Sequence, residues 1–147
     1  MKRILVATDG SAGGSAAVDA AFELAQETGA LVTIVCVRHI PELLGSPLYQ
    51  RALSEELRQG RAVIDEATAR AKRAGVEVES EILSGHAAEE IVQLARLRDV
   101  DLIVVGSHGR GRVATALLGS IANLIVHNAD RPVLVVKQQV EERRQAA

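Results

Sequence analysis

Glycine and serine residues at fixed offsets form the stretch of this sequence with the clearest chemical meaning. Gly106-Ser107-His108-Gly109 directly follows the apolar run 102–105, and Gly119-Ser120 begins after nine further residues. Glycine lets a backbone approach a ligand without a Cβ in the way, and the amides that begin a helix favour an anion. The spacing therefore predicts a phosphate-binding site and, with it, a nucleotide ligand.

Composition limits the other classes of ligand. The 147 residues are 48% hydrophobic and 24% charged, which is typical of one globular domain. We expect that domain to span residues 1–140, with a polar tail at 141–147. Phe22 and Tyr49 are the two aromatic residues and the net charge is −2. A chain with so few stacking side chains and no basic surplus is not expected to bind nucleic acid or a membrane surface.

The sequence also predicts a cytoplasmic protein. No apolar stretch approaches the roughly 20 residues that a membrane span needs, and no signal peptide is visible at the N-terminus. Cys36 is the single cysteine and lies in an apolar run. It excludes an internal disulfide, and we interpret it as a buried structural thiol.

Apolar, β-branched runs alternate with helical patterns along the chain. The runs predict strands at 4–7, 31–37, 76–83, 102–105 and 133–136. The patterns predict helices at 15–28, across 53–71, at 87–97 and at 114–126. Four of the strands are almost continuously apolar, which is typical of strands buried on both faces. The expected fold is α/β: a single doubly wound domain with a five-stranded parallel sheet, helices on both faces and right-handed crossovers.

Capping residues support these boundaries. Ser11 is placed to cap the first helix, and Gly29 and Gly75 are placed to end the first and second helices. Prolines and glycine in residues 40–48 predict a loop, and Gly60 lies inside the helix that follows. We expect the segment 40–60 to be the part of the chain that moves.

The predicted topology brings the best candidate loops together. Ligands of open parallel sheets bind beyond the carboxyl ends of the strands, where the strand order reverses. For the order 3-2-1-4-5 that point lies between the first and fourth strands. The loops 7–11 and 106–112 follow those two strands, and the loop 84–86 lies to the side. Topology and glycine spacing therefore predict the same pocket.

Three motifs of the chain resemble the universal stress protein family, in its ATP-binding branch. They are Ile-Leu-Val-Ala-Thr-Asp-Gly-Ser at 4–11, the glycine spacing of 106–120, and Arg-Pro-Val-Leu-Val-Val at 131–136. The resemblance covers nearly the whole chain. It implies ATP as the ligand, with Mg²⁺ or Mn²⁺ as a candidate metal ion bound through the phosphates. Cys36 stands where many members have histidine, a difference that we do not expect to affect binding.

The resemblance also implies a role for individual residues. Asp9 is expected near the sugar and phosphates, the backbone of Val37 at adenine, and the glycine motif around the ribose and triphosphate. The complete set of implied binding residues is Ala7, Asp9, Val37, Val105, Gly106, Gly109, Gly119, Ser120 and Ile121.

Several of these residues have a simpler structural interpretation. Asp9 could end a strand and assist the next helix, and Ser120 could be an ordinary hydroxyl of the last helix. Arg110 and Arg112 are either solvated charges or groups that screen a triphosphate. His108 has no carboxylate neighbour in sequence, so we do not expect it to be a catalytic base.

Other nucleotide motifs fit less well. Residues 109–114 match the GxGxxA fingerprint but follow the fourth strand, with no second mononucleotide-binding half after them. The phosphate loop that ends in Gly-Lys-Ser/Thr is absent from the sequence, and Ser107 and Ser120 have no evident His and Asp partners. We therefore favour a binding protein over an efficient ATPase, kinase or hydrolase.

Three functional hypotheses follow. The first is a cytoplasmic ATP-binding stress-response regulator. In this hypothesis, ATP in the pocket changes the conformation of segment 40–60 or the oligomeric state, and this change alters the contact with a protein partner. The second is a slow, metal-dependent ATP hydrolase that uses Asp9, and the third is an interaction module with an empty pocket. Strand Val133–Val136 is expected at the sheet edge, where it can pair with a second copy, and the family resemblance implies such a homodimer.

Overall fold

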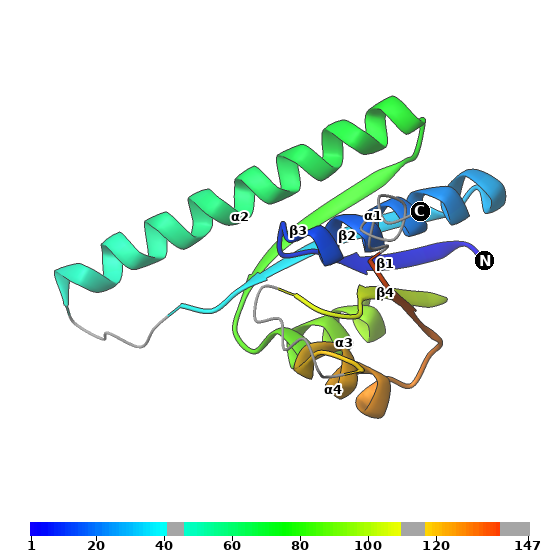
Figure 1. Cartoon of the computed structure of the whole chain (residues 1–147). Coiled ribbons are helices and arrows are strands. Elements are labelled where there is room, and N and C mark those ends of the chain that lie inside the picture. Colours follow the sequence, from blue (N-terminus) through cyan, green and yellow to red (C-terminus); the bar gives the residue numbers. More distant parts are fainter. Residues whose placement is uncertain (41–45, 110–116, 139–147) are drawn as a thin grey trace, which may run out of the picture.

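A computed structural model describes residues 1–40, 46–109 and 117–138 (Figure 1). The elements are β1 (Arg3–Ala7), α1 (Ala12–Thr28), β2 (Leu31–Arg38), α2 (Pro47–Ala74), β3 (Val78–Ser84), α3 (Ala87–Leu97), β4 (Leu102–Gly106), α4 (Ser120–Asn128) and β5 (Val133–Val136). The strands form one parallel sheet in the order β3-β2-β1-β4-β5, which confirms the predicted fold class and strand order. Arg110, Arg112 and the tail 141–147 lie outside the described residues.

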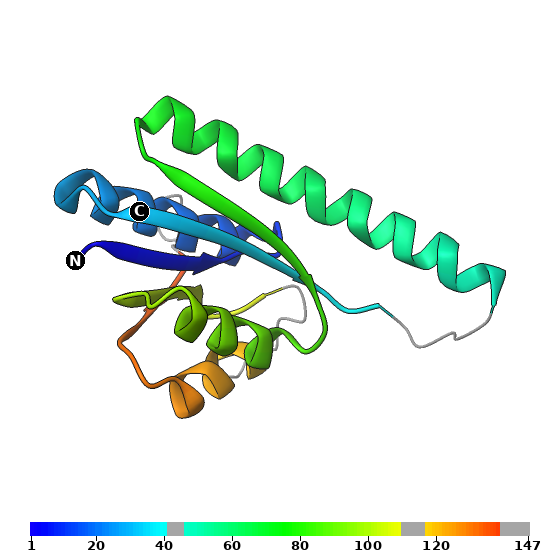
Figure 2. The same cartoon turned by 180° about the vertical axis from the view of Figure 1, so that it is seen from behind.

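The sheet is covered on both faces, α1 and α2 on one and α3 and α4 on the other (Figures 1 and 2). Side chains of β1 alternate between the two layers, as the two-residue period of a strand requires. Ile4 and Val6 pack with α1 and α2, whereas Leu5 packs with α3 and α4. All three are fully buried. This alternation explains the continuous apolar character of the central strands.

The predicted caps are confirmed. The Ser11 side chain accepts a hydrogen bond from the Gly14 amide at the start of α1. Gly29 and Gly75 end α1 and α2 with φ of 74° and 69°, a left-handed conformation that favours glycine. After Gly75, the Val76 amide still donates to the Ala71 carbonyl at 3.0 Å. Strand β3 therefore begins at Val78 instead of Val76.

Helix α2 is longer than predicted and extends past the sheet (Figure 2). It begins at Pro47, a residue that we expected in the loop, with Ser46 as its N-cap. At 1.5 Å per residue its 28 residues span about 42 Å. Leu57 continues the apolar period of this helix toward its N-terminus but is 43% exposed, because burial along the helix begins only at Gly60. In the part of the chain described, no helix is long and apolar enough to cross a membrane, α2 included.

Helix α4 starts later than predicted. The apolar spacing continues back across Gly119, but this glycine takes an extended conformation and serves as the N-cap. Its amide donates to the Ser107 carbonyl at 2.6 Å instead of joining a helix. Leu117 and Ile121 continue the apolar spacing of the predicted helix, but they are 86% and 44% exposed and so are not part of the core. Residues 114–116 lie outside the described residues.

Candidate functional site

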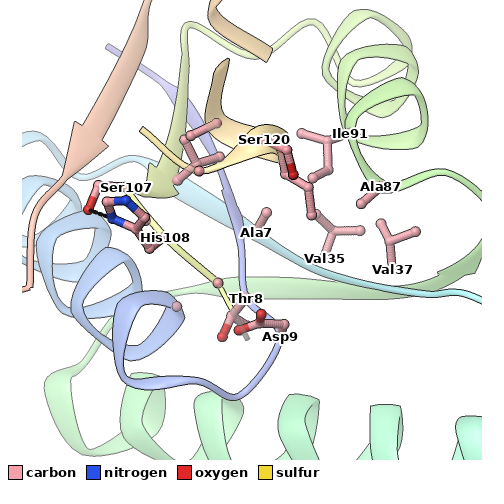
Figure 3. Close-up of a pocket in the computed structure, with 17 residues that line it drawn as sticks. Ala7, Thr8, Asp9, Val35, Val37, Ala87, Ile91, Ser107, His108 and Ser120 are labelled. Atoms are coloured by element: carbon pink, nitrogen blue, oxygen red, sulfur yellow. Dashed lines mark hydrogen bonds between the residues drawn. The ribbon is translucent and has the colours of Figure 1, made fainter. Parts of the chain in front are cut away.

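One pocket lies at the carboxyl ends of β1 and β4, where the topology predicted it (Figure 3). About 780 Å³ inside it is free of protein atoms, counted out to its open mouth. All nine residues implied by the family resemblance line it: Ala7, Asp9, Val37, Val105, Gly106, Gly109, Gly119, Ser120 and Ile121. Their role in binding a ligand stays a prediction.

One end of the pocket is apolar. Val35 and Val37 come from β2, and Ala87 and Ile91 come from the first turns of α3; all four lie together on one side of the pocket in Figure 3. Of these, the sequence singled out only Val37. The residues of α3 have no chemical signature of their own, and only the packing of this helix brings them to the pocket.

The turn after β1 forms another part of the pocket wall. The Asp9 carboxylate accepts a hydrogen bond from the Ser11 amide at 2.9 Å, and the Thr8 hydroxyl accepts one from the Gly10 amide at 3.2 Å. Gly10 has φ of 82°. Asp9 therefore does assist the start of α1, as the simpler interpretation held. It also lines the pocket, so the two roles coexist, and the turn fixes its orientation.

Glycines bring α1 and β4 into direct backbone contact beside the pocket. A Cβ on Gly106 would lie 2.7 Å from the Gly13 carbonyl oxygen, and a Cβ on Gly13 would lie 2.1 Å from the His108 oxygen. Both distances are too short for any side chain. Gly106 is thus required by packing, independently of a ligand, and the sequence analysis missed its partner Gly13. The Gly13-Gly14 pair at the start of a helix is the signal that could have revealed this contact.

The N-terminus of α4 faces the same pocket. Gly119, Ser120, Ile121 and Ala122 all line it. The first turn of any helix leaves amides without an intrahelical acceptor and carries a partial positive charge. Gly119 forms no side-chain cap. These amides are suited to bind an anionic group of a ligand.

Ser107 and His108 complete the wall between β4 and α4. The imidazole Nδ1 of His108 and the hydroxyl of Ser107 are 3.2 Å apart, a hydrogen bond drawn in Figure 3. Ser107 is buried, at 6% exposure. Its amide donates to the Val136 carbonyl of β5 at 2.9 Å. Backbone contacts on both sides therefore hold this corner of the pocket in place.

The described residues contain no ready-made metal centre: no group of three or more His, Cys, Asp or Glu side chains among them could hold an ion. Among the residues that the structure describes, Asp9 is the single carboxylate that lines the pocket. Oxygen ligands suit Mg²⁺ and Mn²⁺, so these ions fit the site only together with oxygens supplied by a ligand.

Comparison with known proteins places this chain in a family. The model of the universal stress protein family matches residues 1–137. The chain belongs to the universal stress protein family. It is 35% identical over 147 residues to universal stress protein MJ0531 of Methanocaldococcus jannaschii, covering 96% of this chain and 85% of that protein. A universal stress protein of Thermus aquaticus is 38% identical over 138 residues, covering 92% and 98% of the two chains.

Solved structures of universal stress proteins share the fold over nearly their full length. Protein MJ0577 of Methanocaldococcus jannaschii superposes with a TM-score of 0.84 at 27% identity, covering 95% of this chain and 97% of that one. A universal stress protein solved in complex with cAMP superposes with a TM-score of 0.75 at 30% identity, covering 94% and 98%. The resemblance found in the sequence is therefore confirmed at the level of the family.

Proposed function

We propose that this universal stress protein binds ATP in the pocket between β1 and β4 and acts as a cytoplasmic regulator that responds to occupancy. The observation that carries the proposal is the convergence of the nine expected binding residues on one pocket. They come from β1, β2, β4 and α4 and from the loops that follow β1 and β4. Residues so far apart in the sequence would not be expected to line one cavity by chance.

The pocket offers groups that suit both parts of a nucleotide. The apolar end, with Val35, Val37 and Ile91, suits a flat base whose edge is recognised by backbone groups. The amides at the start of α4 and the backbone of Gly109 also line the pocket and suit the phosphates. A relative in complex with cAMP supports an adenine nucleotide. Mg²⁺ or Mn²⁺ would accompany the phosphates, with Asp9 as the protein's own oxygen ligand.

A buried arginine links the base end of the pocket to the projecting half of α2. Arg38 directly follows Val37 and is 7% exposed. Its guanidinium donates to Glu56 at 2.8 Å and to Gln59 at 2.6 Å. Gly60 faces its side chain, and a Cβ there would lie 3.4 Å from the Arg38 Cγ. A ligand that shifts Val37 would act on α2 through this contact, which supports a regulatory role for segment 40–60.

ATP is expected to stabilise the purified protein against heat. A ligand that binds only the folded state at about 100 times its Kd adds about 2.7 kcal/mol to the free energy of unfolding. We expect the melting temperature to rise with ATP and to change much less with an equal concentration of inorganic triphosphate, which lacks the base. Equal shifts with both compounds would contradict binding in this pocket.

We also propose a homodimer through β5. This strand lies at the edge of the sheet, and Leu134 on it is 37% exposed. The Ile103 and Ser107 amides donate to the carbonyls of Pro132 and Val136, so alternate carbonyls point to β4. The backbone groups of Val133 and Val135 consequently point away from β4 and can pair with a second copy.

Val135→Pro is expected to convert the dimer to a monomer in light scattering at micromolar concentration. Proline removes the outward amide of Val135 while leaving the hydrogen bonds to β4 in place. ATP binding serves as the control, because the pocket lies on the other side of β4. A wild-type protein that is monomeric at this concentration, or a variant that remains dimeric, would contradict the proposed interface.

A further inference from the structure

We propose that His39 and His86 together bind a divalent transition-metal ion such as Zn²⁺. The two residues are far apart in the sequence, but the fold brings the centres of their imidazole rings to 6.2 Å, with the ring planes tilted by 34°. Neither residue lines the pocket between β1 and β4. The metal site is therefore a separate one, and its test does not depend on nucleotide binding.

The sheet holds the two histidines next to each other. His39 directly follows β2, and His86 comes shortly after β3, the strand that pairs with β2 up to Arg38 and Ser84. Beyond this last pair, the Gly85 amide donates to the Arg38 carbonyl at 3.0 Å. Gly85 has φ of 137°, a conformation that other residues rarely adopt. The ladder and this glycine turn together set the position of both imidazoles.

The imidazole of His86 has no role in capping α3. His86 is the N-cap residue of this helix, but its side chain forms no capping hydrogen bond. Within the described part of the chain, neither His39 nor His86 uses its ring in a hydrogen bond or an ion pair, and both residues are exposed. The ring nitrogens are therefore accessible to an ion from solvent.

The spacing of the two rings suits a shared metal ion. A Zn–N bond is about 2.0–2.1 Å long, so the centres of two imidazoles on one zinc ion lie about 5–6 Å apart. The observed distance of 6.2 Å is slightly longer, and a small rotation of two exposed side chains closes the difference. Imidazole suits Zn²⁺, Cu²⁺ and Ni²⁺, whereas Mg²⁺ prefers oxygen ligands. Water completes the coordination, so we expect weaker binding than at a zinc site with four protein ligands.

Acidic residues offset the charge of the nearby helix end. The N-terminus of a helix carries a partial positive charge, which disfavours a cation. The first turn of α3 contains Glu89 and Glu90. The Glu90 carboxylate lies over the turn before His86, because a Cβ on Gly85 would be 3.0 Å from its Oε1. Its negative charge favours a cation beside His86 without being a metal ligand itself.

Calorimetric titration of the untagged protein with zinc chloride, without nucleotide, tests the site at about pH 7.5, where free imidazole is mostly neutral. We expect one zinc ion per chain for the wild type. The affinity of His39→Gln and of His86→Gln should each be lower by about tenfold or more. His127→Gln is the matched control and should bind as the wild type does, since His127 lies in the last turn of α4 and its ring contacts the Asn123 carbonyl. Magnesium chloride should not bind at this site.

Nuclear magnetic resonance of the histidine side chains locates the ion. Zinc should shift the ring signals of His39 and His86 and leave those of His108 and His127 unchanged. Circular dichroism should show the wild-type fold for both variants, because both replaced side chains are exposed.

Three results would overturn the proposal. They are a wild type that binds no zinc, equal zinc affinity in the wild type and both variants, and zinc-induced shifts confined to other histidines. None of them affects the nucleotide proposal, which rests on different residues. Failure to bind nucleotide would likewise leave the metal site untouched.

Discussion

Replacing Gly106 with valine is expected to lower the free energy of unfolding by about 3 kcal/mol, the upper part of the usual cost of overpacking a core. A Cβ at this position would lie 2.7 Å from the carbonyl oxygen and 2.8 Å from the carbonyl carbon of Gly13. Both are backbone atoms, so helix α1 must move away from β4. Urea denaturation followed by circular dichroism measures the loss.

Gly109→Ala is the matched control for this effect. Within the described part of the chain, a Cβ on Gly109 would meet only the Asp9 side chain, with the Asp9 Oδ2 at 2.8 Å and its Cγ at 3.8 Å. The free oxygen of this carboxylate can shift by a few tenths of an ångström more easily than backbone can, so we expect a smaller loss of stability than for Gly106→Val. Equal denaturation midpoints for Gly106→Val and the wild type would show that α1 and β4 are not in contact.

Gly109→Val is expected to reduce the affinity for ATP by at least about 100-fold, or about 2.7 kcal/mol, while the fold persists. The branched side chain would extend into the pocket beside Asp9, in the space proposed for the phosphates. Gly119 offers a less clean test, because a Cβ there lies 3.1 Å from the Ser107 carbonyl oxygen and would disturb the backbone. Calorimetric titration gives the affinity, and circular dichroism reports the fold.

The alanine variant again provides the comparison. Gly109→Ala adds one methyl group to the same place, so we expect a loss of affinity between those of the wild type and the valine variant. A valine variant that binds ATP as well as the wild type would mean that the phosphates do not pass Gly109.

Much of the fold could be predicted because local and global signals agree. Ser11 begins α1, and Gly29 and Gly75 end α1 and α2, at the points where the helical spacing of apolar residues starts or stops. The central strands are apolar on both faces, as their burial in both layers requires. The prediction failed at α4, where the helical period runs back across Gly119. Periodicity could not show that the Gly119 amide is used by the Ser107 carbonyl, a contact between distant elements.

The polar part of the site was predicted through residues with recognisable chemistry, and part of its apolar wall was missed. Asp9, Gly109 and Ser120 have types and spacing that suggest phosphate binding. Ala87 and Ile91 do not, and their place in the pocket depends on how α3 packs on the sheet. The projection of α2 was also beyond prediction, because the sequence shows the length of the helical pattern but not where the sheet beneath it ends.

Calorimetric titration of the nucleotide-stripped protein with ATP, AMP and NAD, with and without magnesium, tests the central claim most directly. The account predicts that ATP binds with one molecule per chain, that NAD binds far more weakly, and that Gly109→Val removes the ATP signal. No heat with any of the three compounds, together with no competition among them, would contradict a nucleotide site. The glycines around Gly106 and Gly13 would then serve only to bring α1 against β4.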